Sequence, residues 1–314
     1  MAVLSFFTMR KAKNSIFAVL GGLFCLNILA WIAVYEVSQP RFLEVNFFDV
    51  GQGDAIFIET PKRHQILIDG GPSSVILEKL GKEMPFWDRS IDLIILTHPE
   101  RDHLAGLIEV LKRYKVENIL WTGVIRNTSE YQEWIKSIQN EKAKIKIAKA
   151  NQKIILSKSD WGPSSAWEGG GRVGVHNFID VLYPLENLEG QTFKDSNNTS
   201  IVAKLVFGEN SFLFTGDIDK SAEGKLIESG VDINSNVLKV AHHGSKTSTA
   251  EEFIREVFPE IAVIQAGKDN PYGHPHQETL ETLTKYGINI LRTDKDGDIK
   301  ILCDSQSLKL KLKK

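Results

Sequence analysis

A mixed α/β fold is the architecture that this sequence predicts: two packed β-sheets with helices outside, an αββα sandwich, preceded by one N-terminal transmembrane helix. Apolar runs of strand length alternate with segments of helical periodicity in both halves of the chain. A separate uncharged stretch near the N-terminus has the length of a membrane-spanning helix. The 314 residues, of which 42% are hydrophobic, are sufficient for one large core.

The N-terminal segment is set apart by its charge. Ile16–Val34 contains no charged residue and one strongly polar residue, Asn27, and basic residues precede it at positions 10, 11 and 13. A cleaved signal peptide is the competing interpretation and a buried core helix a weaker one, but the long, bulky apolar stretch favours an uncleaved anchor. The positive-inside rule then predicts a cytoplasmic basic tail at residues 1–14, a transmembrane anchor at residues 15–37 and an extracytoplasmic domain at residues 38–314.

The domain after the anchor alternates between two kinds of segment. Short apolar runs rich in β-branched and aromatic residues predict strands, and longer segments with apolar residues three or four apart predict helices. The predicted strands are Leu43–Phe48, Ala55–Glu59, Gln65–Ile68, Asp92–Leu96, Asn118–Trp121, Phe178–Leu182, Ile201–Phe207, Phe212–Phe214, Val237–Ala241, Ile261–Gln265, Ile288–Leu291 and Ile299–Leu302. The predicted helices are His103–Tyr114, Ser129–Asn140, Lys220–Glu228, Ala250–Val257 and Gln277–Tyr286. Residues 151–172 are predicted to be a loop-rich insertion because glycine and serine are frequent there.

Charge and cysteine content narrow the classes of function. The formal net charge is −2, so the chain lacks the basic excess typical of nucleic-acid-binding proteins. Its two cysteines, Cys25 and Cys303, are too few for a disulfide framework. A metal site in this chain must therefore use nitrogen and oxygen ligands.

The most informative motif is the heptapeptide Thr97–His103, which reads Thr-His-Pro-Glu-Arg-Asp-His and follows a predicted buried strand. Mixed imidazole and carboxylate ligands suit zinc, manganese or iron. On an extended backbone His98 and Glu100 point the same way and would hold one ion. Asp102 and His103 diverge and would hold a second ion. A charged loop with Asp102 as a helix cap is the structural alternative.

This motif is similar to the His-x-His-x-Asp-His signature of the metallo-β-lactamase superfamily, with glutamate in place of the second histidine. The hydrolase domain of ComEC-type competence proteins, which are involved in DNA uptake, also has an acidic residue at this position, so the motif resembles that branch of the superfamily. Further segments are similar to that branch in the expected order: residues 47–55 (FFDVGQGDA), 66–71 (ILIDGG), 195–200 (DSNNTS), 214–217 (FTGD), 237–245 (VLKVAHHGS) and 270–275 (NPYGHP). The resemblance covers roughly residues 42–302 and implies the αββα fold and a dinuclear metal site.

The resemblance implies further ligands for two divalent ions, either Zn²⁺ or Mn²⁺. Asp217 matches the bridging carboxylate of the family, although it could instead cap the helix that follows. The last ligand could be His242, His243 or His274. We favour His242, because adjacent residues at the end of a strand face opposite ways. Asn198 stands where the family has a histidine, which predicts that one ion is held more weakly.

Two cations at this site would lower the pKa of a bridging water and polarise a phosphoryl or carbonyl oxygen. The carboxylate of Glu100 favours a harder cation such as Mn²⁺. The catalytic candidates are Asp102, which helps to hold the second ion, His243, which could protonate the leaving oxygen, and Asp69, which orients a ligand histidine or a water. The backbone N–H groups of residues 244 and 245 could hold a phosphate at the start of the next helix. The predicted substrate contacts are Asn198, Gly244, Ser245, Asn270 and His274.

Three functions compete. The resemblance favours a membrane-anchored phosphodiesterase or nuclease that acts on DNA outside the cytoplasm, with single-stranded DNA as its partner. A hydrolase of a lactone, a thioester or a small phosphodiester would use the same site, and the acidic charge mildly favours it. A non-catalytic binding module with a degraded site would account for the absence of a histidine at Asn198.

Overall fold

The computed structural model describes residues 17, 19–32, 34, 42–156, 177–304 and 306–312. Two units are distinguished, Met1–Arg41 and Phe42–Lys314, and each is described by itself. In the first unit, residues 19–32 are helical. Among the described residues, no helix combines the length and the apolar character needed to cross a membrane. The predicted span Ile16–Val34 includes positions 16, 18 and 33, which lie outside the described residues.

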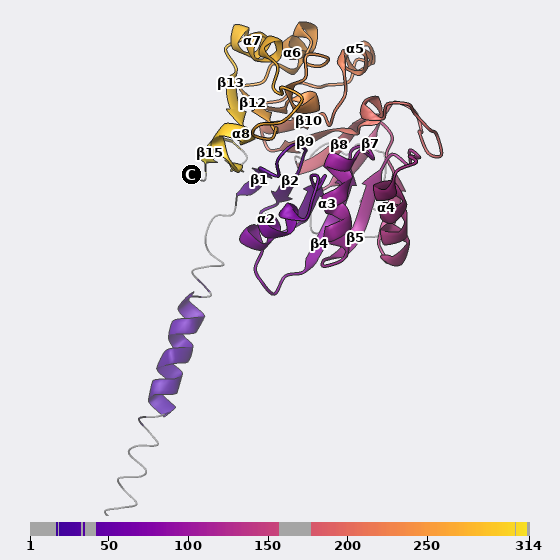
Figure 1. Cartoon of the computed structure of the whole chain (residues 1–314). Helices are drawn as coiled ribbons and strands as arrows, with labels where there is room; N and C mark the ends of the chain where they lie inside the picture. The colour runs from indigo at the N-terminus through magenta and orange to yellow at the C-terminus, as the bar shows by residue number, and fades with distance from the viewer. Residues whose placement is uncertain are drawn as a thin grey trace, which may run out of the picture. The chain divides into compact units, whose positions relative to one another are not determined.

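The second unit is built on two mixed sheets (Figure 1). The first sheet has the strand order β15-β14-β1-β2-β3-β4-β5-β6, and the second has the order β13-β12-β11-β10-β9-β8-β7. The strands of the first sheet are β1 (Leu43–Phe47), β2 (Ile56–Glu59), β3 (Gln65–Ile68), β4 (Ser90–Leu96), β5 (Lys115–Trp121), β6 (Lys144–Ile147), β14 (Ile299–Cys303) and β15 (Leu308–Leu312). Those of the second are β7 (Gln152–Ile155), β8 (Asn177–Tyr183), β9 (Val202–Phe207), β10 (Asn210–Phe214), β11 (Val237–Lys239), β12 (Ile261–Ile264) and β13 (Asn289–Arg292).

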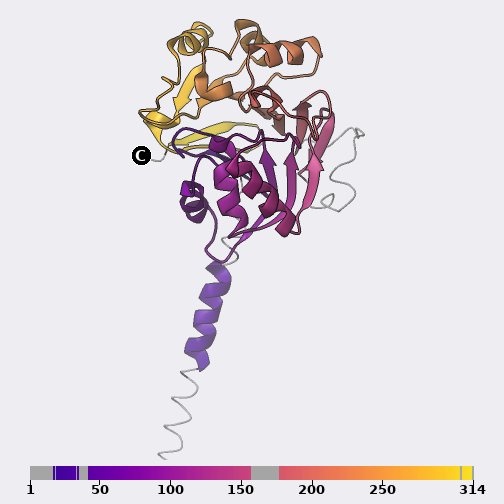
Figure 2. The same cartoon turned by 45° about the vertical axis from the view of Figure 1, so that its right-hand side comes forward.

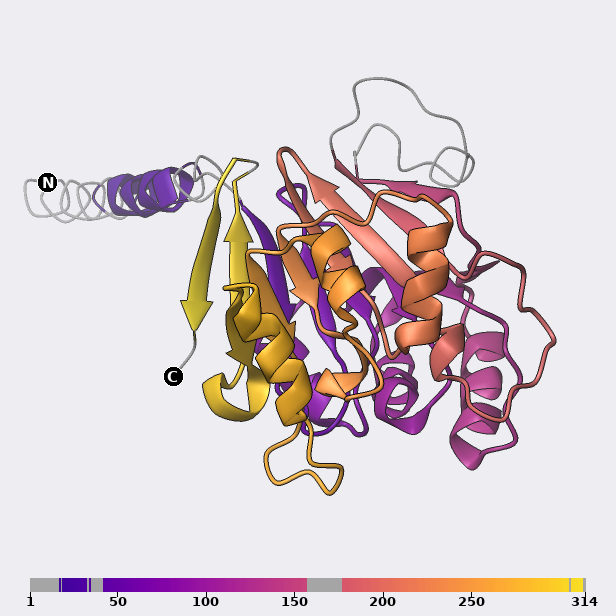
Figure 3. The ribbon, with the colours of Figure 1, turned by 90° about the horizontal axis from the view of Figure 1, so that it is seen from above.

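Helices cover the outer faces of both sheets, so the unit has four layers. One apolar core, which includes Phe47, Leu205 and Phe212, fills the space between the sheets. A second core lies between the first sheet and the helices α2 (Val75–Glu83), α3 (Arg101–Leu111) and α4 (Ser129–Asn140). A third lies between the second sheet and the helices α5 (Lys220–Glu228), α6 (Glu251–Val257) and α7 (Gln277–Lys285). Figures 2 and 3 show the two groups of helices on opposite sides of the strands. The predicted αββα sandwich is confirmed.

Several elements differ from the prediction. α4 and α5 have the predicted bounds, whereas α2, the short helix α8 (Thr293–Asp296) and the strands β6, β7 and β15 are not predicted. β7 lies at the start of the segment predicted to be a loop, and residues 157–172 of that segment lie outside the described residues. β6 (KIKI) and β15 (LKLKL) are edge strands with exposed lysines, so they lack the buried apolar run that identifies the central strands.

Parallel pairing brings the loops of the predicted motifs to one end of the unit. β3, β4, β5 and β6 are parallel neighbours, and so are β10, β11, β12 and β13. The carboxyl ends of parallel strands meet at the same edge of a sheet, where α/β proteins usually place their sites. The motifs after β3, β4, β10 and β11 therefore come together.

α3 packs directly on the loop after β3. The backbone N–H of Gly106 donates to the carbonyl oxygen of Gly71 at 2.9 Å, and that of Gly70 donates to the carbonyl oxygen of His103 at 2.8 Å. A Cβ atom on Gly106 would lie 1.8 Å from the oxygen of Gly70. This close approach fixes His103 relative to Asp69, which precedes the loop.

We expect Gly106→Ala to destabilise the domain by about 2–3 kcal/mol, because the added methyl group forces α3 away from the loop after β3. The matched control is Gly224→Ala in α5, where a Cβ atom would meet nothing within 4 Å in the described structure. There the greater helix propensity of alanine should stabilise the protein by about 0.5–1 kcal/mol. Urea unfolding provides both free energies, and equal stabilities of the two variants would contradict this packing.

Candidate metal centre

Four ligand atoms converge at the carboxyl ends of the strands. The Nε2 atoms of His103 and His243 each lie 3.3 Å from Oδ2 of Asp217. Oδ2 of Asp102 lies 3.3 Å from Nε2 of His243 and 3.9 Å from Nε2 of His103. All four lie within 4.8 Å of one another. Two imidazole nitrogens and two carboxylate oxygens fit a divalent cation such as zinc or manganese. We call these residues the metal-binding group.

In each of the two imidazoles, Nδ1, on the side of the ring away from the convergence, lies beside a hydrogen-bond acceptor. Nδ1 of His103 lies 2.8 Å from Oδ2 of Asp69, and Nδ1 of His243 lies 2.8 Å from the carbonyl oxygen of Gln265. A carbonyl oxygen can only accept a hydrogen bond, so Nδ1 of His243 carries a proton. An ionised carboxylate also only accepts, so Nδ1 of His103 carries a proton when Asp69 is ionised. In the neutral rings the Nε2 lone pairs then point at the convergence. Asp69 lies where its predicted role, to orient a histidine, requires it to be.

Charge is shared within this buried group. Burial alone would lower the pKa values of His103 and His243, but Asp217 and neighbouring carboxylates raise both well above the usual range. Burial would raise the pKa of Asp217, whereas His243 and His103 hold it well below the usual range. A cation must displace protons from both imidazoles, so its binding strengthens as the pH rises. Burial and the nearby His103 lower the pKa of His98 to about 3, which leaves that imidazole neutral.

A buried ion pair behind the metal-binding group is absent from the sequence prediction. Lys239 and Asp54 are each 1% exposed and form an ion pair. Nζ of Lys239 donates to the carbonyl oxygen of Gly216 at 2.9 Å and lies 3.6 Å from Oδ1 of Asp217. Oδ1 of Asp54 lies 3.3 Å from Nδ1 of His243. Lys239 therefore gives this acidic site a fixed positive charge. The available sequence signals are a lysine within an apolar run and an aspartate after Gly-Gln-Gly.

The predicted ligands His98 and Glu100 are not among the four converging residues. A bend follows β4, so the extended backbone on which their prediction depends is absent. His98 is buried beside His103, with ring centroids 4.2 Å apart, and its Nε2 has no hydrogen-bond partner among the described residues. Glu100 instead forms an ion pair with Arg126 at 2.7 Å and accepts a hydrogen bond from Ser196. The carboxylate of Glu100 is thus engaged with a cation of the chain itself.

His243 rather than His242 joins the metal-binding group, which reverses the predicted assignment. The prediction extends the strand to Ala241, but the strand ends two residues earlier and a 3₁₀ turn, Ala241–Gly244, follows. Both histidines have left-handed backbones, with φ values of 50° and 54°. In this turn His243 is buried, whereas His242 is half-buried and its Nε2 lies 3.4 Å from Nδ2 of Asn197.

Asn197 rather than Asn198 lies beside these histidines. Oδ1 of Asn198 accepts a hydrogen bond from the backbone N–H of Asp219 at 2.9 Å, so Asn198 holds the start of α5. Asp219 is the N-cap of α5, because its side chain accepts from two backbone N–H groups of the first turn. The structure therefore excludes the alternative role of Asp217 as the helix cap.

At Gly244 and Ser245 the backbone differs from the helix start that the predicted phosphate contact assumes. The N–H of Ser245 donates to the carbonyl oxygen of His242 at 2.8 Å, and the next helix begins only at Glu251. Gly244 has a φ of 81°, and a Cβ atom on it would lie 2.6 Å from Cβ of Pro275. These residues shape the turn that carries the histidines.

Asn270 and His274 belong to one loop but differ in role. The side chain of Asn270 bonds its own loop, because Nδ2 donates to the carbonyl oxygen of His274 at 2.6 Å and Oδ1 accepts from its N–H at 3.0 Å. The imidazole of His274 lies 5.6 Å from that of His242, between ring centroids. Burial and the nearby His243 lower the pKa of His274 to about 4, so its ring is neutral at physiological pH.

A cavity of about 640 Å³ opens beside the metal-binding group. Asp102, Asp217, His242 and His274 line it, together with the cationic side chains of Arg126 and Lys194. His243 lines it as well, so a ligand in the cavity can reach three of the four residues of the metal-binding group and two basic side chains.

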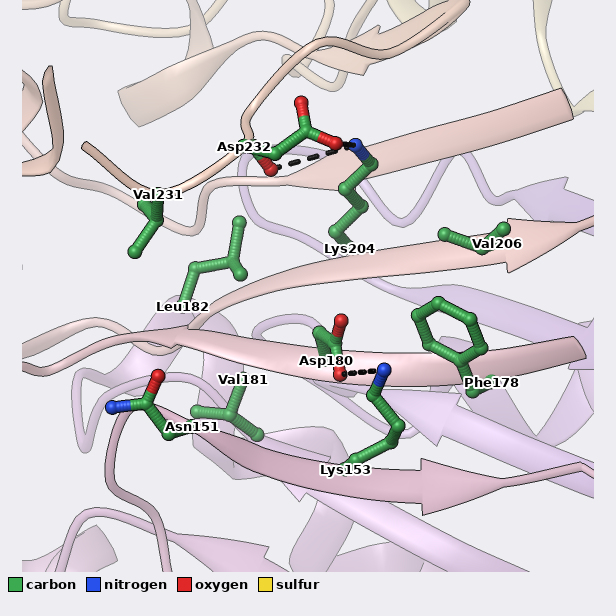
Figure 4. A pocket seen from close by; sticks show the side chains of 10 residues that line it. All are labelled: Asn151, Lys153, Phe178, Asp180, Val181, Leu182, Lys204, Val206, Val231 and Asp232. Atoms are coloured by element: carbon green, nitrogen blue, oxygen red, sulfur yellow. Dashed lines mark hydrogen bonds and ion pairs between the residues drawn. The ribbon is translucent and has the colours of Figure 1, made fainter. Parts of the chain in front are cut away.

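A second cavity, of about 510 Å³, lies on the outer face of β7, β8 and β9 (Figure 4). Its lysines are paired: Nζ of Lys153 lies 3.4 Å from Asp180, and Nζ of Lys204 lies 2.8 Å from Asp232. Lys153 also lies 3.7 Å from the ring centroid of Phe178. With its cations neutralised and no titratable cluster of the kind described above, this cavity offers less chemistry than the first.

The fold and the metal-binding group agree with comparisons of the sequence. The metallo-beta-lactamase superfamily matches residues 48–268, and the chain belongs to this superfamily. The resemblance noted from the motifs is thus confirmed. Igni18, a metallo hydrolase from Ignicoccus hospitalis, has a similar fold, with a TM-score of 0.51 at 15% identity over 82% of this chain and 98% of that structure.

Competence-related proteins are among its relatives. ComE operon protein 3 of Bacillus subtilis is 30% identical over 95% of this chain and 37% of that protein. Recombination protein 2 of Haemophilus influenzae is 28% identical, over 89% and 31%, and competence protein ComA of Neisseria gonorrhoeae is 27% identical, over 83% and 32%. The chain spans about a third of the length of these relatives.

We expect Lys239→Met to destabilise the protein by about 3–5 kcal/mol, because it leaves Asp54 as a buried carboxylate without its cation. The double variant Asp54→Asn/Lys239→Met removes both charges and should recover more than half of that loss. Urea unfolding of the wild type, both single variants and the double variant provides the coupling free energy. Additive effects of the two substitutions would show that the pair does not act as a unit.

Proposed function

We propose that this chain hydrolyses phosphodiesters with a divalent cation, and that DNA outside the cytoplasm is its substrate. The observation that carries the proposal is the convergence of two imidazole Nε2 atoms and two carboxylate oxygens. The Nδ1 atom of each imidazole is hydrogen-bonded to an acceptor, which fixes the orientation of the ring. A cation bound there would supply a low-pKa water and polarise a phosphoryl oxygen. Asp102, His103, Asp217 and His243 hold that cation, and Lys239 offsets part of their negative charge.

His274 is a hydrogen-bond donor to the substrate in this proposal. Oε1 of Gln52 accepts from the N–H of Gly267 at 3.1 Å, so the amide of Gln52 presents Nε2 to Nδ1 of His274 at 3.3 Å. Nδ1 then accepts, and the proton of the neutral ring resides on Nε2. This N–H can donate a hydrogen bond to a phosphoryl oxygen of the substrate. His243, which was predicted to protonate the leaving oxygen, is engaged in the metal-binding group instead.

DNA is favoured as the substrate by two observations. The relatives named above are a competence protein, a recombination protein and a ComE operon product. Lys194 lines the cavity, forms no ion pair with a described residue and provides a cation that can contact a phosphate group. Turnover of a lactone or thioester instead of DNA is the competing outcome, since the same fold serves such substrates.

We propose one firmly bound ion and a weaker second site. The first has four protein ligands. The second would rest on His98, because Glu100 is paired with Arg126. This refines the sequence prediction of two ions, and zinc and manganese both suit the ligands.

The decisive experiment measures metal content and turnover of single-stranded DNA and a bis-aryl phosphodiester by the full chain. Asp217→Ala and His243→Ala should each lose most of the metal and at least about 100-fold in turnover, as expected for ligands of a catalytic ion. Glu100→Gln and His242→Ala are the matched controls and should keep the first ion. If His242→Ala loses the metal while His243→Ala retains it, the assignment of the two histidines is wrong. Full metal content with turnover of esters alone would reject the phosphodiesterase.

We also propose that residues 15–37 anchor the chain with its domain outside the cytoplasm. The basic residues before an uncharged stretch support this orientation. A reporter enzyme fused after Lys314 should be active only when it requires export. Activity of a cytoplasmic reporter at the same position would overturn the orientation.

A further inference from the structure

We infer that the end of the first sheet opposite the metal centre docks on an anionic lipid bilayer. This basic end comprises the connections β2–β3, α2–β4, α3–β5 and α4–β6, with the first residues of β5 and β6. Because β3, β4, β5 and β6 are parallel, all four connections lie at the same end of the sheet (Figure 1). The basic end would dock on the same membrane that holds the proposed anchor. This docking does not depend on the proposed hydrolysis of phosphodiesters.

The basic end concentrates positive charge in a chain of net charge −2. Basic residues outnumber acidic ones there by eight to two. All eight basic side chains are exposed: Lys62, Arg63, Arg89, Lys112, Arg113, Lys115, Lys142 and Lys144. Of these side chains only Lys112 forms an ion pair with a described residue, and the others, which include Lys62, Arg113 and Lys142, form none. Such side chains are free to meet anionic headgroups, which attract clustered lysine and arginine.

An exposed aromatic pair protrudes from the same end. In the connection between α2 and β4, Phe86 is 80% exposed and Trp87 is 72% exposed. Their ring centroids are 4.8 Å apart and their planes meet at 83°. Tryptophan beside basic residues is typical of the membrane interface, where the ring lies at headgroup level.

The first strand of the domain begins at the basic end. β1 begins at Leu43 at this end, because it is antiparallel to β2, which is antiparallel to β3. Eight peptide units separate Val34 from Phe42, and a fully extended chain of that length spans about 28 Å. A bilayer that holds Ile16–Val34 therefore lies within reach of the basic end. The metal centre lies at the other end of β4, about 20 Å away along the strand.

Single-stranded nucleic acid is the other polyanion that a basic, aromatic surface could bind. Bases stack on exposed ring faces, usually on several successive platforms. The perpendicular rings of Phe86 and Trp87 form one compact wedge instead. A strand bound there would also lie a full strand length from the metal centre. The bilayer is therefore the favoured partner.

The test measures quenching of tryptophan emission by brominated lipids in vesicles with and without phosphatidylglycerol, using the full chain. The difference between the wild type and Trp87→Phe isolates Trp87 from the other tryptophans. We expect Trp87 to be quenched in anionic vesicles. The triple variant Lys62→Glu/Arg113→Glu/Lys142→Glu should lose this quenching. The matched control reverses exposed lysines elsewhere, Lys136→Glu/Lys149→Glu/Lys225→Glu, and should keep it.

Two outcomes overturn the inference. If Trp87→Phe is quenched as strongly as the wild type, Trp87 does not contact lipid. If the first triple variant loses binding of a labelled oligonucleotide while Trp87 is not quenched by lipid, the basic end binds nucleic acid. Metal content and turnover of a soluble phosphodiester should be unchanged in both triple variants, which separates this test from that of the proposed hydrolysis. A triple variant that fails to fold is identified by its loss of metal. In that case the comparison of the wild type with Trp87→Phe decides whether the basic end contacts lipid.

Discussion

The site depends on the acceptors behind its two imidazoles. The carboxylate of Asp69 and the carbonyl oxygen of Gln265 each hold one Nδ1–H, and this alone directs both Nε2 atoms to the same point. Asp69 is held in turn by the backbone N–H and the hydroxyl of Thr97, at 2.8 and 2.6 Å. These groups follow β3, β4 and β12, so both sheets must be assembled before the ligand atoms can meet.

The layers of the fold could be predicted because central strands and amphipathic helices have local sequence signals. Buried runs such as Ile91–Leu96 identify strands by composition, and α4 shows its period in the sequence alone. The edge strands β6 and β15 owe their conformation to a neighbour on one side, and their exposed lysines conceal it. Pairing of this kind is tertiary, so no local pattern identifies it with certainty.

The composition of the site was predictable to a similar extent. The motifs locate the loops that meet, and three of the four converging residues, Asp102, His103 and Asp217, are predicted ligands. The choice between adjacent histidines depends on two left-handed residues in a turn, which a strand-based argument cannot anticipate. The pair of Asp54 and Lys239 joins positions far apart in the chain, and neither residue has a local pattern that indicates its partner.

The left-handed backbones at the site connect metal supply to the lifetime of the protein. Asp69, His242 and His243 all have positive φ values, and each costs about 1–2 kcal/mol relative to a relaxed backbone. A domain has only about 5–15 kcal/mol of stability, so this strain is a sizeable fraction of it. Any cation that binds only the folded site adds to that stability in proportion to the logarithm of its concentration. A bound cation would therefore offset part of this strain, and the resistance of the domain to proteases would then rise with the concentration of free metal around it.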